Sequence, residues 1–364
     1  MKFKIILATA GFVLFAVTGC ACSKKAEVPP ADATVAEDNS IQNPTEKTES
    51  QPTGNITAKG ATMDWKYTNE VMIKSSDPEP IDKILELADK SENGRAEVYF
   101  QFEVKNEPDL QGLEYLLREY GPRVTTFEIL VPPKMIKPEM PIRFLMPDNV
   151  DTRLIITGMG DKPLDLTAVT LNLGADTLVV RNFRFDKQEY RSALVLEVGK
   201  LFTGENLSFN NNKFEHHVAF MASPLVVLKS RANEGEASNY VLKNVSFAGN
   251  QSDVLLAIDE ESRGKFERIE LDHVVAKDNT NLSMGIDISA TKEVFVHDCE
   301  LTGSKAAPLL YQILPDPEVT IKDSKVSNRV YGYRPQKENW HTDAKPVTKV
   351  NLDEAEGTTY DKVP

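Results

Sequence analysis

Five polar residues recur at matching places in successive apolar, strand-like segments, and their side chains could carry out chemistry. They are Glu197, Lys229, Asp259, Asp287 and Gln312. If the segments stack as neighbouring strands, roughly 4.8 Å apart, the five side chains form one outward column. A lysine between carboxylates could then remove the proton beside the carboxyl group of a uronate sugar, provided that burial lowered its pKa.

The carboxylates of this column leave other chemistries open. Asp259 and Asp287 could bind Ca²⁺, a cofactor expected only for a lyase, where it would neutralise the uronate. They could instead serve as the acid and the base of a glycoside hydrolase. A solvated sheet face also carries alternating charges, because cross-strand pairing and solubility favour them. Glu197, Lys229, Asp259 and Asp287 are therefore candidate catalytic residues, with a solvated face as the alternative.

A second polar column belongs to the internal repeat that is described in the next paragraph, and it lies three residues after the first residue of each repeat unit. It consists of Arg181, Asn210, Lys243, Asp272, His297 and Lys322. Arg181, Lys213 and Lys243 make a locally basic patch that could bind an anionic glycan or a protein partner, or could simply face water. The formal charge of −13 argues against a nucleic-acid partner, which needs clustered cations. His216 and His217 are adjacent and would point to opposite faces of a strand, so no metal site is predicted.

An internal repeat supplies the elements that must position these residues. An apolar residue is followed two residues later by another, four residues later by Asn, Asp or His, and seven residues later by a third apolar residue. The units begin at Leu178, Leu207, Tyr240, Ile269, Val294 and Val319, with spacings of 25 to 33 residues. The first two positions alternate as in a half-buried strand. Asn and Asp tolerate the left-handed conformation of a sharp bend, where they are expected to stack as a structural ladder.

A single unit of this kind cannot bury its apolar face, whereas stacked units can. The repeat and the apolar segments between its units therefore predict a mainly β chain, a single-stranded right-handed parallel β-helix over residues 126–330. Residues 61–125 contain two short helical patterns and an alternating strand. They are expected to form a small mixed helical cap at the N-terminal end of the β-helix. An antiparallel sandwich with chance alternation is the alternative fold.

This pattern, together with the upstream segments at 141–146 and 154–160, resembles the pectin-lyase-like β-helix superfamily. The resemblance implies that the face with the Lys229 column corresponds to the substrate groove of the lyases in that superfamily. Leu228-Lys229-Ser230 is weakly similar to a Lys-Ser element of chondroitinase- and alginate-lyase-type enzymes. Their Arg-His-Gly element in the next turn is absent, because that turn has Ala-Ile-Asp-Glu at 257–260. The superfamily includes lyases, hydrolases, epimerases, esterases and adhesins, so the fold selects no activity.

The N-terminal residues have the features of an exported lipoprotein. Two lysines precede an apolar run at 5–17, which is too short to span a membrane and is typical of a secretory signal. The sequence Val17-Thr18-Gly19-Cys20 resembles the bacterial lipobox, and this resemblance implies cleavage after Gly19 and acylation of Cys20. The expected order is a signal peptide (1–19), a lipidated, disordered tether (20–60), the cap (61–125), the β-helix (126–330) and a C-terminal tail (331–364).

These features together predict an exported protein anchored in the bacterial outer membrane through the Cys20 lipid. The favoured hypothesis is a cell-envelope β-helix that binds polysaccharide or an envelope protein through one outward face, with Phe295 and Tyr311 as the best aromatic residues for sugar stacking. One alternative is a polysaccharide lyase or glycoside hydrolase that acts on an acidic glycan. A second alternative is a structural spacer in the envelope.

Overall fold

The structure, a computed structural model, describes part of the chain. The described residues are 70–133, 142–148, 150–188, 192–214, 224–280, 282, 284–302, 309–312 and 317–327, with short pieces at 331–333, 346–347, 352–354 and 359–361. The chain divides into two units, Met1–Asp64 and Trp65–Pro364, and all described residues belong to the second. The expected signal peptide, tether and acylated Cys20 therefore lie outside them. Within the described part, no helix is both long and apolar enough to span a membrane.

Strands dominate the described unit. The helices are α1 (Pro80–Asp89), α2 (Glu107–Tyr120) and the 3₁₀ helices η1 (Gly121–Arg123) and η2 (Glu260–Ser262). The strands are β1 (Val71–Lys74), β2 (Ala96–Glu103), β3 (Val124–Val131), β4 (Ile142–Leu145), β5 (Arg153–Gly158), β6 (Leu164–Thr167), β7 (Leu171–Asp186), β8 (Leu194–Asn210), β9 (Pro224–Ser230), β10 (Ser238–Ala248), β11 (Val254–Ile258), β12 (Phe266–Asp272), β13 (Val275–Lys277), β14 (Met284–Asp287), β15 (Glu293–His297), β16 (Glu300–Leu301), β17 (Leu310–Gln312), β18 (Glu318–Lys322), β19 (Lys325–Ser327), β20 (Tyr331–Tyr333), β21 (Pro346–Val347), β22 (Leu352–Glu354) and β23 (Thr359–Asp361).

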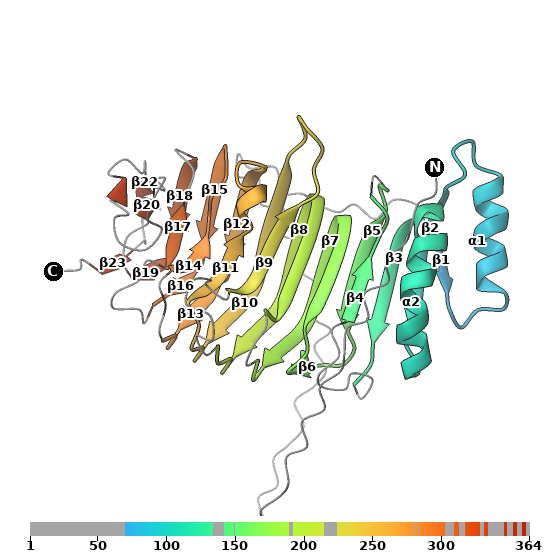
Figure 1. Cartoon of the computed structure of the whole chain (residues 1–364), viewed down its shortest axis with the longest axis horizontal. Coiled ribbons are helices and arrows are strands. Elements are labelled where there is room, and N and C mark those ends of the chain that lie inside the picture. Colours follow the sequence, from blue (N-terminus) through green and yellow to red (C-terminus); the bar gives the residue numbers. More distant parts are fainter. Residues whose placement is uncertain are drawn as a thin grey trace, which may run out of the picture. The chain divides into compact units, whose positions relative to one another are not determined.

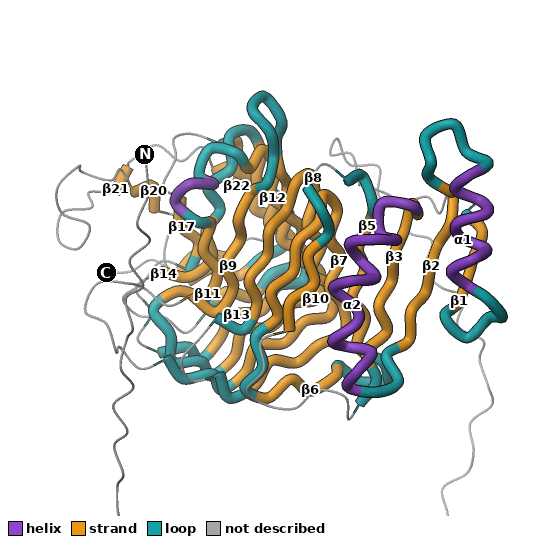
Figure 2. Tube along the Cα trace, turned by 45° about the vertical axis from the view of Figure 1, so that its right-hand side comes forward, coloured by secondary structure: helices purple, strands orange, loops and turns teal. Residues whose placement is uncertain are grey.

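Apart from the antiparallel pair of β20 and β21, the strands pair in parallel along three stacks (Figures 1 and 2). The first stack contains β1, β2, β3, β5, β7, β8, β10, β12, β15 and β18. The second contains β4, β7, β8, β9, β11, β14 and β17. The third contains β6, β7, β8, β10, β13, β16 and β19. The chain passes through the first, third and second stack in each turn, which is a parallel β-helix, as the repeat predicts.

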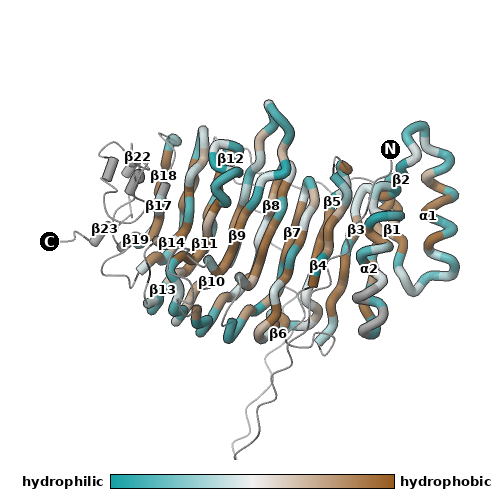
Figure 3. Tube along the Cα trace, in the orientation of Figure 1, coloured by the Kyte–Doolittle hydropathy of each residue, from teal (hydrophilic) through white to brown (hydrophobic). Residues whose placement is uncertain are grey.

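One buried file of apolar side chains runs through the first stack. Its members pair in register from strand to strand and are Phe127, Leu154, Leu178, Phe202, Tyr240, Ile269, Val294 and Val319. Figure 3 shows how apolar residues follow the strands, whereas the loop between β9 and β10 is polar. Five of the six positions that the repeat places in this file are therefore correct.

The prediction for Leu207 is wrong, because this residue pairs with Phe183 and Val245 and belongs to the third stack. The true unit starts five residues earlier, at Phe202. Its second inward position is Gly204, where an added Cβ would meet the Leu242 and Phe202 side chains at 3.1 Å. A glycine at an inward position gives no apolar signal, so the next alternating segment of β8 was mistaken for the start of the unit.

Each turn bends at two corners through residues with a positive φ. The first corner, between the first and third stacks, uses Asn182, Asn206, Asn244, His273, Asp298 and Asp323, with φ between 48° and 64°. The second corner, between the third and second stacks, uses Lys187, Asn211, Gly249 and Asp278, with φ between 53° and 64°. The left-handed bend predicted for Asn, Asp and His is confirmed, although Asn211 serves the second corner.

A ladder of buried side-chain amides follows the second corner. Its members, one residue after each bend, are Gln188, Asn212, Asn250 and Asn279. The Asn212 and Asn250 Nδ2 groups donate to the Oδ1 of the next amide at 2.9 Å, and the side chain of each of these residues also bonds to backbone groups of other turns. This ladder satisfies the polar backbone of the bend inside the coil.

The two helices belong to the N-terminal cap, at the β1–β3 end of the coil in Figure 1. Pro80 opens α1, and a capping box formed by Asn106 and Asp109 opens α2. Ile84 of α1 and Leu113 of α2 are fully buried and join the same apolar core as the strands. The cap therefore shares a core with the coil.

Candidate functional site

Three residues of the predicted catalytic column do lie side by side. Glu197 pairs with Lys229, and the Asp259 N–H donates to the Leu228 carbonyl at 2.8 Å, which places Asp259 next to Lys229 in register. All three side chains are half-buried on the second stack. Among the described residues, however, no ion pair of 4.0 Å or less joins them. They form a polar column without a close ion pair among its described members.

The position predicted for Asp287 is wrong. It pairs with Tyr311, and the pairing of Leu256 with Ile286 places it level with Ala257, two residues away from the expected place beside Asp259. Its side chain is fully buried, where burial raises its pKa to about 6. A shift of two residues leaves every side chain on the same face, so strand alternation could not reveal the error. Asp259 and Asp287, the pair considered for Ca²⁺ under the lyase hypothesis, are therefore two residues out of register.

Two other residues of the second stack also differ from expectation. Tyr311, expected to be an outward aromatic, is 2% exposed, and its hydroxyl donates to the Leu256 carbonyl at 3.3 Å. Gln312 pairs with Gly332 and continues no charged column. The second stack thus offers no exposed aromatic at Tyr311 for sugar binding.

The predicted basic patch is not a continuous surface. Glu205 lies between Arg181 and Lys243 in the pairing of β7, β8 and β10. Asn210, expected in this column, lies in the third stack, because the repeat unit of β8 starts five residues earlier than predicted. Lys213 lies at the second corner, where it pairs with Gln251. The outward column of the first stack therefore alternates in charge.

The Arg181 side chain donates a hydrogen bond to a buried carboxylate, that of Glu128. Glu128 is 2% exposed and accepts hydrogen bonds from Tyr99, Gln101, Thr157 and Arg181 at 2.7–2.8 Å. Burial alone would raise the pKa of Glu128, but these four hydrogen bonds hold it below the usual value. Every donor faces the same carboxylate, so this network is a structural element of the first turns.

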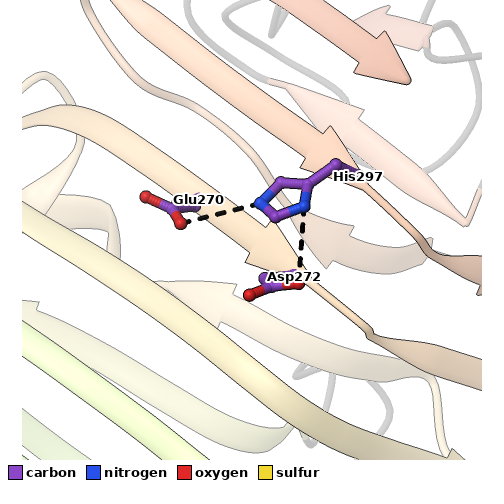
Figure 4. Close-up of side chains that lie close together, drawn as sticks. All are labelled: Glu270, Asp272 and His297. Atoms are coloured by element: carbon purple, nitrogen blue, oxygen red, sulfur yellow. Dashed lines mark ion pairs between the residues drawn. The ribbon is translucent and has the colours of Figure 1, made fainter. Parts of the chain in front are cut away.

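The clearest gathering of reactive groups lies further along the first stack (Figure 4). Glu270 and Asp272 share the outward face of β12, and Asp272 pairs with His297 of β15. The His297 Nε2 is 3.6 Å from the Glu270 Oε1, and its Nδ1 is 3.4 Å from the Asp272 Oδ1. All three are partly buried. We call Glu270, Asp272, His297 and the neighbouring Phe295 the outer cluster.

The charges in the outer cluster stabilise one another. The interaction with the nearby Glu270 carboxylate raises the pKa of His297, and Asp272 adds to this effect, although burial opposes it. The interaction with His297 lowers the pKa of Glu270, with help from Lys243 and Arg268. Glu270 is thus ionised at neutral pH, and it is not suited to act as a general acid.

An aromatic ring completes the outer cluster. Phe295 pairs with Glu270 on one side and Thr320 on the other, on the outward face. Its side chain is partly exposed, and the Arg268 guanidinium lies over the ring at 4.8 Å from the centroid. Phe295 was foreseen as a sugar-stacking residue, but its association with Glu270 and His297 was not. The available signal was the Glu-x-Asp spacing at 270–272, which places both carboxylates on one face of a strand.

No family model matches this chain, and no curated protein and no solved structure matches it. The case for a function is therefore made from the fold and the outward side chains.

Proposed function

We propose that the protein is an exported, lipid-anchored β-helix of the bacterial cell envelope that binds polysaccharide through the outward face of β12, β15 and β18. The observation that carries this proposal is the outer cluster, in which a partly exposed aromatic ring adjoins ionised and hydrogen-bonding side chains.

The outer cluster has the groups that sugars require. The face of Phe295 opposite the Arg268 guanidinium offers an apolar platform to the C–H side of a pyranose ring. The Glu270 and Asp272 carboxylates accept hydrogen bonds from hydroxyl groups, and charged acceptors form the stronger bonds. Glu293 pairs with Arg268 and Glu318 on the same face, so carboxylates are abundant there. We expect a neutral, hydroxyl-rich glycan to bind better than an acidic one.

The anchoring part of the proposal is supported by the sequence of the N-terminus. The lipobox-like motif that ends at Cys20 would attach the chain to the outer membrane, and the polar segment at 20–60 would act as the tether. The β-helix resembles the pectin-lyase-like superfamily in its repeat pattern, and several members of that superfamily act on or bind glycans.

The test is a glycan-binding panel with the full-length protein in detergent. Phe295→Ala is expected to weaken binding to the best glycan at least tenfold. Tyr115→Ala is the matched control, since Tyr115 is 52% exposed on α2, away from the first stack's outward face. Absence of binding to every glycan, or equal binding by Phe295→Ala, would overturn the proposal and favour the spacer hypothesis.

The register of Glu197, Lys229 and Asp259 favours a second candidate, a lyase or hydrolase that acts on an acidic glycan. The same panel, scored for cleavage products and for unsaturated uronate ends, tests it. Lys229→Met should abolish the product if Lys229 is the base. Product formation by that variant at the wild-type rate would reject this role.

Cys20→Ser tests the anchor. The variant should stay unprocessed and unlipidated, and cell fractionation should show that its membrane attachment differs from that of the wild-type protein. A Cys20→Ser protein that is processed and anchored like the wild type would show that the lipobox assignment is wrong.

A further inference from the structure

Two successive turns carry the same pair of metal-binding residue types in opposite order at the first corner. Asp272-His273 ends β12 and His297-Asp298 ends β15. Asp272 pairs with His297, and the His273 N–H donates to the His297 carbonyl at 3.2 Å, so that His273 lies beside Asp298. Both His273 and Asp298 have φ 52°. The fold therefore places two groups of potential ligands side by side, Glu270 with Asp272 and His297, and Asp272 with His273 and Asp298, which share Asp272.

The two distances from His297 Nδ1 fit a shared ion better than direct hydrogen bonds, whereas His273 and Asp272 are hydrogen-bonded to each other. The His297 Nδ1 is 3.4 Å from the Asp272 Oδ1 and 3.6 Å from the Asp298 Oδ2. A charge-assisted N–H···O hydrogen bond measures about 2.7–2.9 Å. Two ligands of a tetrahedral zinc ion, each roughly 2.0–2.1 Å from the metal, lie about 3.3–3.4 Å apart.

The remaining contacts link His273 and Asp298 to Asp272. The His273 Nδ1 contacts the Asp272 Oδ1 directly. Ligand atoms of Asp272, His273 and Asp298 all lie within 4.8 Å of one another. A small ion could therefore reach donors from both turns without a change of backbone.

Glu270 is placed to orient the His297 ring as a metal ligand. It faces Nε2, whereas Asp272 faces Nδ1 of the same ring (Figure 4). Asp298 also lies on the Nδ1 side. The two atoms, Glu270 Oε1 and His297 Nε2, are 3.6 Å apart, and a Glu270 carboxylate that moved closer to accept the Nε2–H would fix the tautomer and leave Nδ1 with a free electron pair toward the other carboxylates. Histidines that bind metals almost always have such a partner on their other nitrogen.

We propose that Asp272, His297 and Asp298, together with His273, bind a divalent transition-metal ion, with zinc as the best fit. Mixed imidazole and carboxylate donors suit zinc, cobalt, nickel and copper, whereas Ca²⁺ and Mg²⁺ prefer oxygen ligands alone. Lys243 pairs with Asp272 on the side away from β15, so the ion enters from the corner. Asp272 and His297 belong both to this site and to the outer cluster, but metal titration without a glycan tests the ion separately from the proposed function.

The test starts from full-length protein in detergent, stripped with a chelator. Zn²⁺ titration by calorimetry, in competition with a chelator of known affinity, is expected to show one strong equivalent that excess Ca²⁺ does not displace. Co²⁺ in place of zinc should give the intense visible absorption of a four-coordinate site. A Zn²⁺ equivalent that Ca²⁺ displaces easily, or no bound equivalent in folded protein, would overturn the proposal.

Variants locate the ion. Asp272→Asn and His297→Ala should each lose the strong equivalent, and Glu270→Gln should weaken it roughly 10- to 100-fold through the loss of its support to His297. Asp323→Asn is the matched control, because Asp323 occupies the same corner one turn further on. His216→Ala/His217→Ala controls for the other histidine pair of the chain.

Circular dichroism and thermal melting of each metal-free variant show whether it folds. If a folded His297→Ala protein keeps the strong equivalent, or if the His216→Ala/His217→Ala variant loses it, the ion lies elsewhere and the assignment fails. Retention by both controls together with loss by folded Asp272→Asn supports it.

Discussion

The two corners of each turn meet the same backbone requirement in opposite ways. Both bend through residues with positive φ. At the second corner the residue after the bend turns its amide side chain inward, where it is buried and hydrogen-bonded to the next turn. At the first corner the bend residue itself is exposed, except for the partly buried Asn182, which bonds to Gly158 and Asn206. The residue at this corner changes along the coil from Asn at 182, 206 and 244 to His273, Asp298 and Asp323.

This difference shows at which corner the fold restricts the choice of residue. A buried amide must donate and accept in a fixed geometry, and an unpaired group there costs free energy. An exposed bend only needs a residue that tolerates the left-handed conformation, which Asn, Asp and His all do. The first corner is therefore free to carry His and Asp as ligands, whereas the second corner keeps amides.

The strongest way to break this comparison is Asn250→Ala. Asn250 Oδ1 accepts from the Asn212 N–H and Nδ2, and its own Nδ2 donates to Phe209 O and Asn279 Oδ1. The variant leaves buried partners unpaired and opens a small cavity, so we expect a loss of about 3–5 kcal/mol in unfolding free energy. Urea unfolding measures it. A loss below about 1 kcal/mol would mean that the ladder is not a major source of stability.

Asp287→Asn tests whether the interior prefers an amide to a carboxylate. Burial raises the pKa of Asp287 from 3.8 to about 6, so the folded state is penalised as pH rises through this range and the carboxylate ionises. Asn can still accept from the Ser289 N–H, which now bonds to Oδ1 at 2.9 Å. We expect the variant to be more stable by about 2 kcal/mol at pH 8 and equal to wild type near pH 4. A variant that is less stable at pH 8 would contradict this expectation.

Asn244→Ala probes the exposed corner. Asn244 has φ 52° and is exposed, so alanine loses only the tolerance of the left-handed conformation. The expected loss is about 1 kcal/mol, and Asn244→Gly should restore most of it because glycine carries no Cβ penalty. Measured by the same urea unfolding, a loss as large as that of Asn250→Ala would remove the distinction between the corners.

The smallest effect is expected for His297→Gln in metal-free protein. The raised pKa of His297 means that its contribution to stability is complete below the unfolded value of 6.5 and fades as pH rises through the higher folded value. The lowered pKa of Glu270 means that its contribution is present above 4.5 and is lost as pH falls.

The wild type should therefore exceed His297→Gln by at most about 1 kcal/mol near pH 5.5, and by less at pH 9. Unfolding curves at these two pH values check it. A difference that is larger at pH 9 would have the wrong sign for this pair.

Much of the fold follows from the sequence, because strand alternation and left-handed bends leave local signals. Those signals place Tyr240, Ile269, Val294 and Val319 in one file. They miss the corresponding unit of β8, because Gly204 has no apolar side chain at the second inward position. Alternation also has a period of two, so it cannot detect the two-residue displacement of Asp287.

The candidate sites were harder to predict than the fold. The register between turns decides which polar residues meet, and insertions of different length set that register. Asp272 and His297 were placed correctly in one column, yet the convergence of Glu270 on His297 depends on side-chain directions that spacing alone does not give. The amide ladder left a signal that was overlooked, since Asn212, Asn250 and Asn279 each directly follow a bend residue.

Each strand pairs with the equivalent strands one turn before and one turn after. This arrangement determines how such a chain can change in length. Whole turns can be duplicated or lost while the coil survives, because every turn presents the same edge to its neighbours. The Asp-His and His-Asp pairs meet only because β12 and β15 are direct neighbours. A duplication inserted between these two strands would preserve the architecture and separate the four ligands, whereas one inserted anywhere else would leave them together.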